Sequence, residues 1–318
     1  MRHSVRKYKE RKSEIVELKN DSVTARIAVN LGNTLFSLQQ EKNEILYFPY
    51  SLEEYSRTKK LAGIPFLHPW ANRLEGDMIS INNCVCLFPD TYKYLLYRDD
   101  HELPMHGVLL KSAQWETQQL LEEEWACHHI AEYFFEGDEL LSLFPFIHSI
   151  RMMHELRDNT LTIETTVTNM DFRPMPVSFG FHPYFLVDTA KRAISRLTLP
   201  AQDVLDVNEL MIPTGKSVLK EKRWDFVNDE ILLKNVSFDH GFTKLKYDNG
   251  VAVFHLNDIK IGFDKKYPYA QVYAPAMADK PYVCIEPMTA ATNALNTLSC
   301  PMIRPNEKFT ASFTISVN

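Results

Sequence analysis

The stretch Leu161-Thr-Ile-Glu-Thr-Thr-Val-Thr168 contains the pattern that decides the fold. Apolar side chains stand at positions 161, 163 and 167, and the residues around them are polar or β-branched. Successive side chains of a strand point to opposite faces of a sheet, so this period of two predicts a strand with one buried face. Phe309-Thr-Ala-Ser-Phe-Thr-Ile-Ser-Val317 repeats the pattern, which indicates a second strand of the same kind.

The same alternation recurs along most of the chain. Val251–Leu256 and Ile259–Phe263 are predicted as two strands joined by the short turn Asn257-Asp258. The pair Asn249-Gly250, directly before the first of them, suits the positive φ angles of a tight hairpin turn. Many short strands at similar spacing favour an antiparallel sandwich or barrel over alternating strands and helices. We therefore predict an all-β fold.

Helical signals are sparse, and nothing in the sequence divides the chain. Residues 52–61 and 188–194 are the candidates for short helices. A length of 318 residues alone would suggest about two domains at roughly 150 residues each. However, we find no repeat and no linker rich in Pro, Ser or Gly, and the strand patterns continue across the midpoint. These observations favour a single domain over residues 1–318.

Charge and composition argue against several function classes. The 35 basic and 41 acidic residues give a formal net charge of −6 with both signs scattered, whereas nucleic-acid binding usually needs a basic stripe. Residues 1–14 have no apolar segment typical of a signal peptide, and runs such as Leu140–Ile147 are far shorter than the roughly 18 residues that span a bilayer. Five cysteines without a CxxC pair indicate a reduced protein. We expect a cytoplasmic protein without nucleic-acid or membrane partners.

A cluster of polar residues lies within the otherwise apolar segment Phe66–Gly76. It places Asn72 and Arg73, which offer fixed hydrogen-bond donors, close to the flat apolar ring of Trp70. Such a set suits a ligand with many hydroxyl groups, and we predict that all three residues bind substrate. A salt-bridged loop with Trp70 in the core is the alternative.

Two histidines lie in settings that suit acid–base chemistry. His182 is surrounded by aromatic residues, and on a strand it would share a face with Gly180 and Tyr184. An imidazole held on a rigid strand is a good general acid, although a core histidine is an equal alternative. His106, between Met105 and a glycine, fits either a binding site or a surface turn.

Two carboxylates complete the candidate set. Glu286 ends an apolar strand, where period two places it with Tyr282 and Cys284. A carboxylate in that position must find donors or lose its hydration, which favours a functional role. Asp239 precedes His240-Gly241 and could accept from hydroxyl groups or cap a turn.

Together these segments resemble the aldose 1-epimerase (galactose mutarotase) family. Its motifs occur in the family's order between residues 66 and 295: His68-Pro-Trp-Ala-Asn72-Arg73-Leu74, Met105-His106-Gly107, Gly180-Phe-His182-Pro-Tyr-Phe185, Phe238-Asp239-His-Gly-Phe242 and Cys284-Ile-Glu286-Pro-Met-Thr289. The resemblance implies one large antiparallel β-sandwich with an open cleft. It also implies an enzyme that interconverts the α and β anomers of a free sugar without a cofactor. Separately, we expect no metal site, and a monomer or homodimer.

The resemblance also implies a role for each motif residue. Glu286 matches the family's general base and His182 its general acid, while His106 matches a histidine that binds the sugar and polarises its ring oxygen. Asn72, Arg73 and Asp239 match positions that bind hydroxyl groups. An ionised carboxylate and a protonated imidazole are the expected pair for ring opening near neutral pH.

Three alternatives remain open at this stage. A hexose-6-phosphate 1-epimerase would need more cationic groups, for which Lys59, Lys60 and Arg98 are candidates. A sugar-binding module without catalysis would keep the fold but not the reaction. A metal enzyme using His68 with the other site residues lacks the usual ligand spacing.

Overall fold

The two stretches quoted first lie side by side in one antiparallel sheet. In the computed structural model, which describes residues 2–81, 84–234, 236–275 and 280–317, Leu161 pairs with Ile315 and Val167 with Phe309. Around them, the described residues form a nine-stranded sheet, named here the β14 sheet. Its strands in spatial order are β11 (Glu116–Glu122), β12 (Cys127–Phe135), β13 (His148–Arg157), β14 (Thr160–Asn169), β28 (Lys308–Val317), β24 (Ile259–Asp264), β23 (Val251–Leu256), β18 (Arg196–Thr198) and β21 (Glu230–Leu232).

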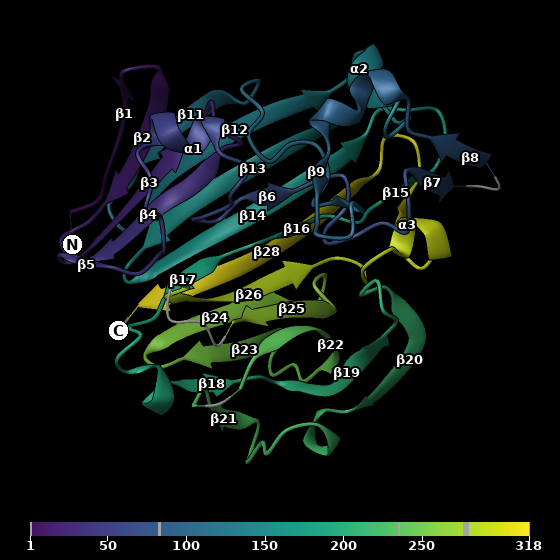
Figure 1. Cartoon of the computed structure of the whole chain (residues 1–318). Helices are drawn as coiled ribbons and strands as arrows, with labels where there is room; N and C mark the ends of the chain where they lie inside the picture. Colours follow the sequence, from purple (N-terminus) through teal and green to yellow (C-terminus); the bar gives the residue numbers. More distant parts are fainter. Residues whose placement is uncertain (1, 82–83, 235, 276–279, 318) are drawn as a thin grey trace.

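A second large antiparallel sheet, named here the β26 sheet, packs against the first (Figure 1). Its strands in order are β20 (Pro213–Leu219), β19 (Ala201–Val207), β22 (Phe238–Leu245), β25 (Tyr269–Ala274), β26 (Tyr282–Met288), β16 (Gly180–Phe181) and β6 (Phe66–Leu67), and β17 (Tyr184–Leu186) also pairs with β26. The core lies between the sheets, where the ring of Phe181 lies 4.9 Å from that of Phe313 and the ring of Phe179 6.0 Å from that of Phe309.

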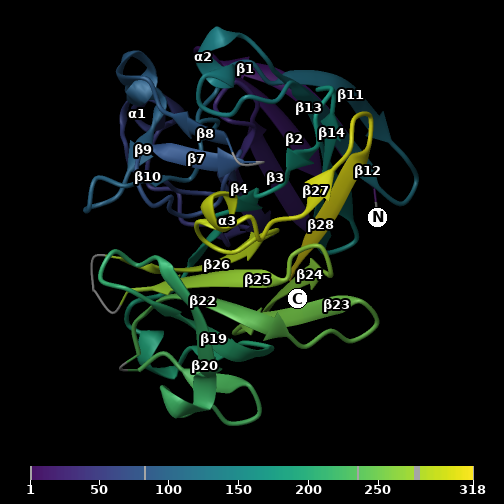
Figure 2. The same cartoon turned by 90° about the vertical axis from the view of Figure 1, so that its right-hand side faces the viewer.

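The remaining strands lie around these two sheets. An N-terminal antiparallel sheet packs on β11, β12 and β13; it contains β1 (Ser4–Glu10), β2 (Ser13–Lys19), β3 (Val23–Ala28), β4 (Thr34–Gln40) and β5 (Asn43–Glu44). Short antiparallel pairs are β7 (Met78–Ile81) with β8 (Cys84–Leu87), β9 (Tyr97–Arg98) with β10 (Pro104–Met105), and β15 (Met175–Pro176) with β27 (Met302–Ile303), the last of which joins segments far apart in the chain. Figure 2 shows β7 to β10 facing β22, β25 and β26 across the molecule. Residues of β9, β10, β22, β25 and β26 line a common cavity, which is described below.

Helices are short, as the sequence predicts. They are α1 (Leu52–Arg57), α2 (Asp138–Leu141) and α3 (Ala294–Thr297), with the 3-10 turns η1 (Asp90–Leu95), η2 (Arg192–Ile194) and η3 (Lys220–Lys222). The helix predicted over 52–61 ends at Arg57, and that predicted over 188–194 is only the turn η2. None of the helices in the described part of the chain is long and apolar enough to cross a bilayer.

The period of two along the strands reflects one buried face per strand, as the sequence suggested. Along β14, buried and half-buried side chains alternate without exception, and the apolar ones are buried. Strands β23 and β24 pair as expected around Asn257-Asp258, with Asn257 at a φ of +51°. The prediction of an all-β antiparallel sandwich is confirmed.

The prediction of a turn at Asp239–Gly241 is wrong, because these residues lie inside β22 and pair with β25.

Candidate active site

A cavity of about 540 Å³ lies over one end of the β26 sheet, between β22, β25 and β26 and the loops that surround β9 and β10. Six of the seven residues predicted from the sequence line it: Asn72, Arg73, His106, His182, Asp239 and Glu286. Tyrosines form much of the remaining wall: Tyr47, Tyr50, Tyr97, Tyr184, Tyr273 and Tyr282. Hydroxyl-bearing rings and charged groups together suit a small polar ligand with flat apolar faces.

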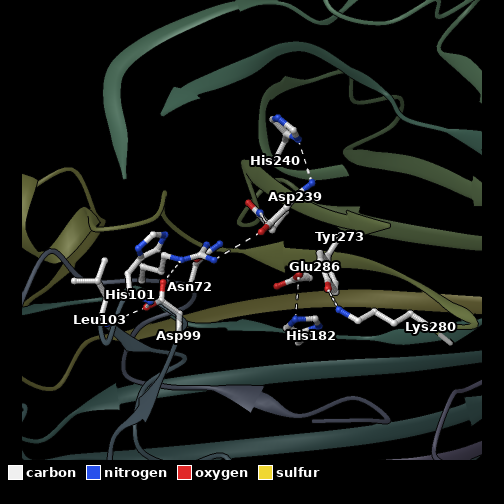
Figure 3. A network of polar contacts seen from close by, with 12 residues as sticks. Asn72, Asp99, His101, Leu103, His182, Asp239, His240, Tyr273, Lys280 and Glu286 are labelled. Atoms are coloured by element: carbon white, nitrogen blue, oxygen red, sulfur yellow. Dashed lines mark hydrogen bonds and ion pairs between the residues drawn. The ribbon is translucent and has the colours of Figure 1, made fainter. Parts of the chain in front are cut away.

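Glu286 and His182 meet at the floor of this cavity (Figure 3). The distance from Glu286 Oε1 to His182 Nε2 is 3.4 Å, and their side chains are only 2% and 7% exposed. Glu286 lies on β26, and His182 lies between β16 and β17, which both pair with β26. Two residues 104 positions apart in sequence (286 − 182) therefore become neighbours through strand pairing.

The alternation of the strands explains why both polar groups point into the cavity. On β26, Val283 and Ile285 enter the main core, so the side chains at 284 and 286 face the other way. In the His182 segment, Phe181 and Phe185 likewise lie in the core, whereas His182 and Tyr184 line the cavity. The shared face predicted for these positions is confirmed.

Burial sets the protonation of the pair. Loss of hydration raises the pKa of Glu286 well above its ordinary range, and the nearby Asp239 adds to this while Arg73 opposes it. Loss of hydration also lowers the pKa of His182 to about 3. Burial therefore favours a neutral carboxylic acid beside a neutral imidazole. This differs from the charged pair expected from the sequence, although both forms hold the same number of protons.

His106 lies beside His182 and is not the surface turn considered as an alternative. It is 4% exposed, and its ring meets that of His182 nearly at a right angle with 5.2 Å between the ring centres. Its backbone has a φ of +65°, and the following Gly107 a φ of +71°. Burial, His182 and Arg73 together lower the pKa of His106 well below its usual value. The imidazole is therefore neutral and can donate one hydrogen bond and accept another.

A chain of charged contacts holds Arg73 at the cavity. Its Nε donates to Asp99 Oδ2 at 2.6 Å and one terminal nitrogen donates to Asn72 Oδ1 at 3.1 Å. The other terminal nitrogen lies 3.7 Å from Asp239 Oδ2, and Asp239 Oδ1 accepts from Gln271 Nε2 at 2.7 Å. This chain, drawn in part in Figure 3, presents donors and acceptors in fixed positions for hydroxyl groups.

The prediction that Trp70 binds substrate is corrected. Trp70 is 1% exposed and does not line the cavity; its ring stacks on Phe88 with 5.6 Å between centres. The large apolar surface of an indole ring stabilises the protein more when it is buried in the core than when it faces a polar cavity.

His68 also faces the core, apart from His106 and His182. Among the described residues, no group of three or more His, Cys, Asp or Glu is placed to hold a metal ion.

Sequence reasoning missed Asp99, Gln271 and the wall tyrosines. Gln271 lies opposite Glu286 in the register of β25 and β26, a relation that no local pattern reveals. Asp99 lies in the polar stretch Arg98–His101, which is typical of an exposed loop, yet its side chain is only 4% exposed. Tyr184 could have been found, because the period of two already placed it on the His182 face.

Comparisons with known proteins agree with this geometry. The family model described as aldose 1-epimerase matches residues 14–316. The chain belongs to the aldose 1-epimerase family. A galactose mutarotase-like protein from Clostridium acetobutylicum has the same fold, with a TM-score of 0.84 at 18% identity over 100% of this chain and 99% of that one.

Two further relatives show how distant the matches are within the family. The galactose 1-epimerase of Lactobacillus acidophilus NCFM superposes with a TM-score of 0.77 at 16% identity, over 100% of this chain and 99% of that one. The uncharacterized protein YihR of Escherichia coli K12 is 21% identical over 232 residues, which is 72% of this chain and 70% of that protein. The family and the fold expected from the motifs are confirmed.

Proposed function

We propose that this aldose 1-epimerase family member interconverts the α and β anomers of a free hexose. The observation that supports this best is the pairing of Glu286 with His182, two buried titratable groups of opposite type 3.4 Å apart at the floor of the cavity. Perturbed acid and base groups that converge in a cleft are typical of catalytic sites. A small sugar is the partner we propose.

The reaction requires two proton transfers across one sugar ring. Glu286 as carboxylate takes the proton of the anomeric hydroxyl while imidazolium His182 gives its proton to the ring oxygen, and the bond between C1 and the ring oxygen breaks to give an aldehyde. Rotation about the C1–C2 bond and reclosure, with both transfers reversed, give the other anomer. Each positioned transfer contributes roughly 10²–10⁴-fold to the rate.

The neutral pair favoured by burial fits one stage of this cycle. After ring opening the carboxyl has gained a proton and the imidazole has lost one, so the enzyme with open aldehyde holds a neutral pair. The two forms differ only in where the same protons lie, and the site needs no proton from solvent to reset. The buried site therefore stabilises the intermediate stage of the reaction relative to the charged stage.

The surrounding groups suit the remaining parts of a hexose. His106 lies next to His182, where a neutral ring can donate to or accept from the sugar beside the ring oxygen. Arg73, Asn72 and Asp239 offer donors and acceptors to hydroxyl groups farther along the cavity. These positions support the roles that the resemblance implied.

A mutarotation assay tests the proposal. Freshly dissolved α-glucose, α-galactose and other aldoses are followed by polarimetry with and without the enzyme, and acceleration of at least one free aldose is expected. Binding of sugar by calorimetry without acceleration of any aldose would instead support the non-catalytic module and overturn the proposal.

A hexose-6-phosphate is the second candidate substrate, because cationic side chains line the cavity. Lys60, Arg98 and Lys280 all face it, whereas Lys59 does not line it. Arg98 already pairs with Asp77 Oδ1 at 2.9 Å, and Asp99, Asp100 and Asp239 offset the positive charge in the cavity. This balance favours a neutral sugar. A higher kcat/KM for glucose 6-phosphate than for glucose would reverse that preference.

A further inference from the structure

A hydrogen bond between two histidine rings links the two large sheets behind the candidate active site. His68 directly follows β6 of the β26 sheet, and His148 begins β13 of the β14 sheet. Their Nε2 atoms lie 2.7 Å apart, and the two residues are 4% and 0% exposed. A contact of this length requires that one nitrogen donates and the other accepts.

The neighbours of the pair fix both tautomers. His148 Nδ1 lies 2.8 Å from the carbonyl oxygen of Phe146, which can only accept, so this nitrogen carries the proton. In a neutral ring His148 Nε2 is then the acceptor, and His68 Nε2 must donate to it. His68 Nδ1 is left as a buried acceptor without a partner among the described residues. Burial lowers the pKa of both rings, that of His148 to about 4, which keeps the pair neutral.

The pair lies in an apolar box of three phenylalanine rings. Phe66 stacks on His68 with 5.4 Å between ring centres, and Phe135 stacks on His148 at 4.5 Å. Phe144 meets both histidines edge-on. Two apolar rings could fill the space between these phenylalanines equally well. A histidine pair adds one thing that apolar rings lack, a directional bond that sets the position of one sheet on the other.

The backbone of His68 in turn supports the residues that line the cavity. Its carbonyl oxygen accepts from the Val108 N–H at 2.8 Å, and a Cβ on Gly107 would come within 2.0 Å of the same oxygen. The His106 N–H donates to the Asn72 carbonyl at 2.9 Å. The segment that leaves His68 is thus interlocked with the turn of His106. A shift of His68 would move both.

We propose that His68 and His148 are positioning residues: their hydrogen bond fixes the Asn72-Arg73 loop and the His106 turn at the sugar site. The inference rests on the proposed function for its kinetic readout. The bond acts through the backbone on groups that touch the sugar, and neither ring lines the cavity. Its loss leaves the fold intact but lets these groups move by a few tenths of an ångström, which weakens substrate binding and proton transfer together.

Three variants separate positioning from packing. His148→Gln keeps an acceptor near the Nε2 position, His148→Asn does not reach it, and the double variant H68F/H148F fills the box with apolar rings. We expect kcat/KM to fall about tenfold or more in the Asn and double-Phe variants, and to stay within about threefold of the parent in the Gln variant. We also expect H68F/H148F to lower Tm only modestly, because it removes both buried imidazoles together and leaves only the Phe146 carbonyl oxygen without its donor.

The proposal is overturned if kcat/KM changes in these variants only where Tm also changes. If H68F/H148F melts with the parent and has the parent's kcat and KM, the bond has no positioning role. If the parent itself accelerates no aldose, the proposed function fails, and ring NMR then decides this inference alone. Labelled protein is expected to show His148 protonated at Nδ1 and His68 at Nε2, and the His106 signals are expected to shift in H68F/H148F; the opposite tautomers, or unmoved His106 signals, contradict it.

Discussion

Glu286 shows how much one side chain depends on its surroundings. The same carboxyl on an exposed strand would be ionised and solvated, but on the buried face of β26 it is 1% exposed and its pKa is raised well above its usual range. Its Oε2 has no hydrogen-bond partner in the described part of the chain. A buried acceptor of this kind is costly unless a ligand satisfies it, and the anomeric hydroxyl of a sugar would do so.

The first prediction concerns this residue. Glu286→Gln keeps the size and the neutral charge that burial favours, but it cannot exchange a proton. We expect sugar binding and Tm close to those of the parent, and a fall in kcat of about 10²–10⁴-fold. Polarimetry on fresh α-glucose or α-galactose measures the rate, and calorimetry measures binding as the control. An unchanged rate in a folded variant would remove Glu286 from the mechanism.

The second prediction concerns Asp99, which the sequence did not single out. Its Oδ2 accepts from Arg73 at 2.6 Å, while Oδ1 accepts from the backbone N–H groups of His101 and Leu103. Asp99→Asn keeps the backbone contacts but turns an amide N–H₂ toward the guanidinium. Hydrogen bonds to charged groups contribute about 1.5–3 kcal/mol, so we expect KM to rise about 10- to 100-fold with a smaller change in kcat.

A neighbouring exposed residue gives the control for this change. Glu102→Gln also removes one negative charge from the loop, but its side chain is exposed and does not line the cavity. It should leave KM within about twofold of the parent, as is usual for surface substitutions. Equal KM changes in the two variants would show that only the net charge of the loop matters, and that Asp99 does not orient Arg73.

At the scale of elements, the His106 turn depends on one glycine. Gly107 has a φ of +71°, and an added Cβ would lie 2.0 Å from the His68 carbonyl oxygen, a distance that real contacts do not reach. The backbones of the two segments therefore approach more closely than any side chain allows. The motif Met105-His106-Gly107 is in this sense a structural requirement of the loop as well as a feature of the site.

The third prediction follows from that contact. Gly107→Ala should lower the free energy of unfolding by roughly 2 kcal/mol or more and reduce kcat/KM, since the turn must move and take His106 with it. Gly137→Ala is the matched control: Gly137 also has a positive φ, of +89°, but apart from its chain neighbours no described residue lies within 4 Å of its added Cβ. Urea unfolding and polarimetry on both variants test this. Equal losses in both would mean that backbone strain alone, without the contact to His68, explains the effect.

At the scale of the whole molecule, the sandwich buries many histidines in neutral form. Complete or partial burial lowers the pKa of seven described histidines below the usual value: His68, His106, His129, His148, His154, His182 and His240. In the unfolded chain these rings take up protons below about pH 6.5. Between that pH and the folded pKa values the unfolded state binds more protons, so stability falls as the pH falls. Glu286, whose folded pKa is raised, acts in the opposite direction with a single proton.

The fourth prediction is therefore that the protein loses stability on acidification at pH values well above those at which carboxylates become protonated. Each histidine contributes up to about 1.4 kcal/mol per pH unit within its window, so we expect unfolding free energy to drop by several kcal/mol between pH 7.5 and 5.5. Urea titrations at the two pH values measure it. His154→Gln, at a ring that is 1% exposed and remote from the cavity, should reduce the slope by about one proton. A stability that is flat across this range contradicts the prediction.

Much of this organisation is visible in the sequence, and its limits are physical. The period of two in residues 161–168 and 309–317 determined the strands, and the alternation around His182 and Glu286 determined which side chains share a face. Periodicity reports one buried face per strand, and this is enough to predict an all-β protein and a candidate acid and base. The ordered motifs added the family.

Only the tertiary structure decided which faces meet. Pairing of β16 and β17 with β26 brings His182 to Glu286, and the register of β25 adds Gln271, because strand neighbours are chosen by contacts that are distant in sequence. The packing between sheets buried Trp70 and joined His68 to His148, and the contact with Arg73 enclosed Asp99. Burial also set the neutral state of the acid–base pair, since the loss of hydration that shifts a pKa depends on all the atoms around a group and not on its neighbours in the chain.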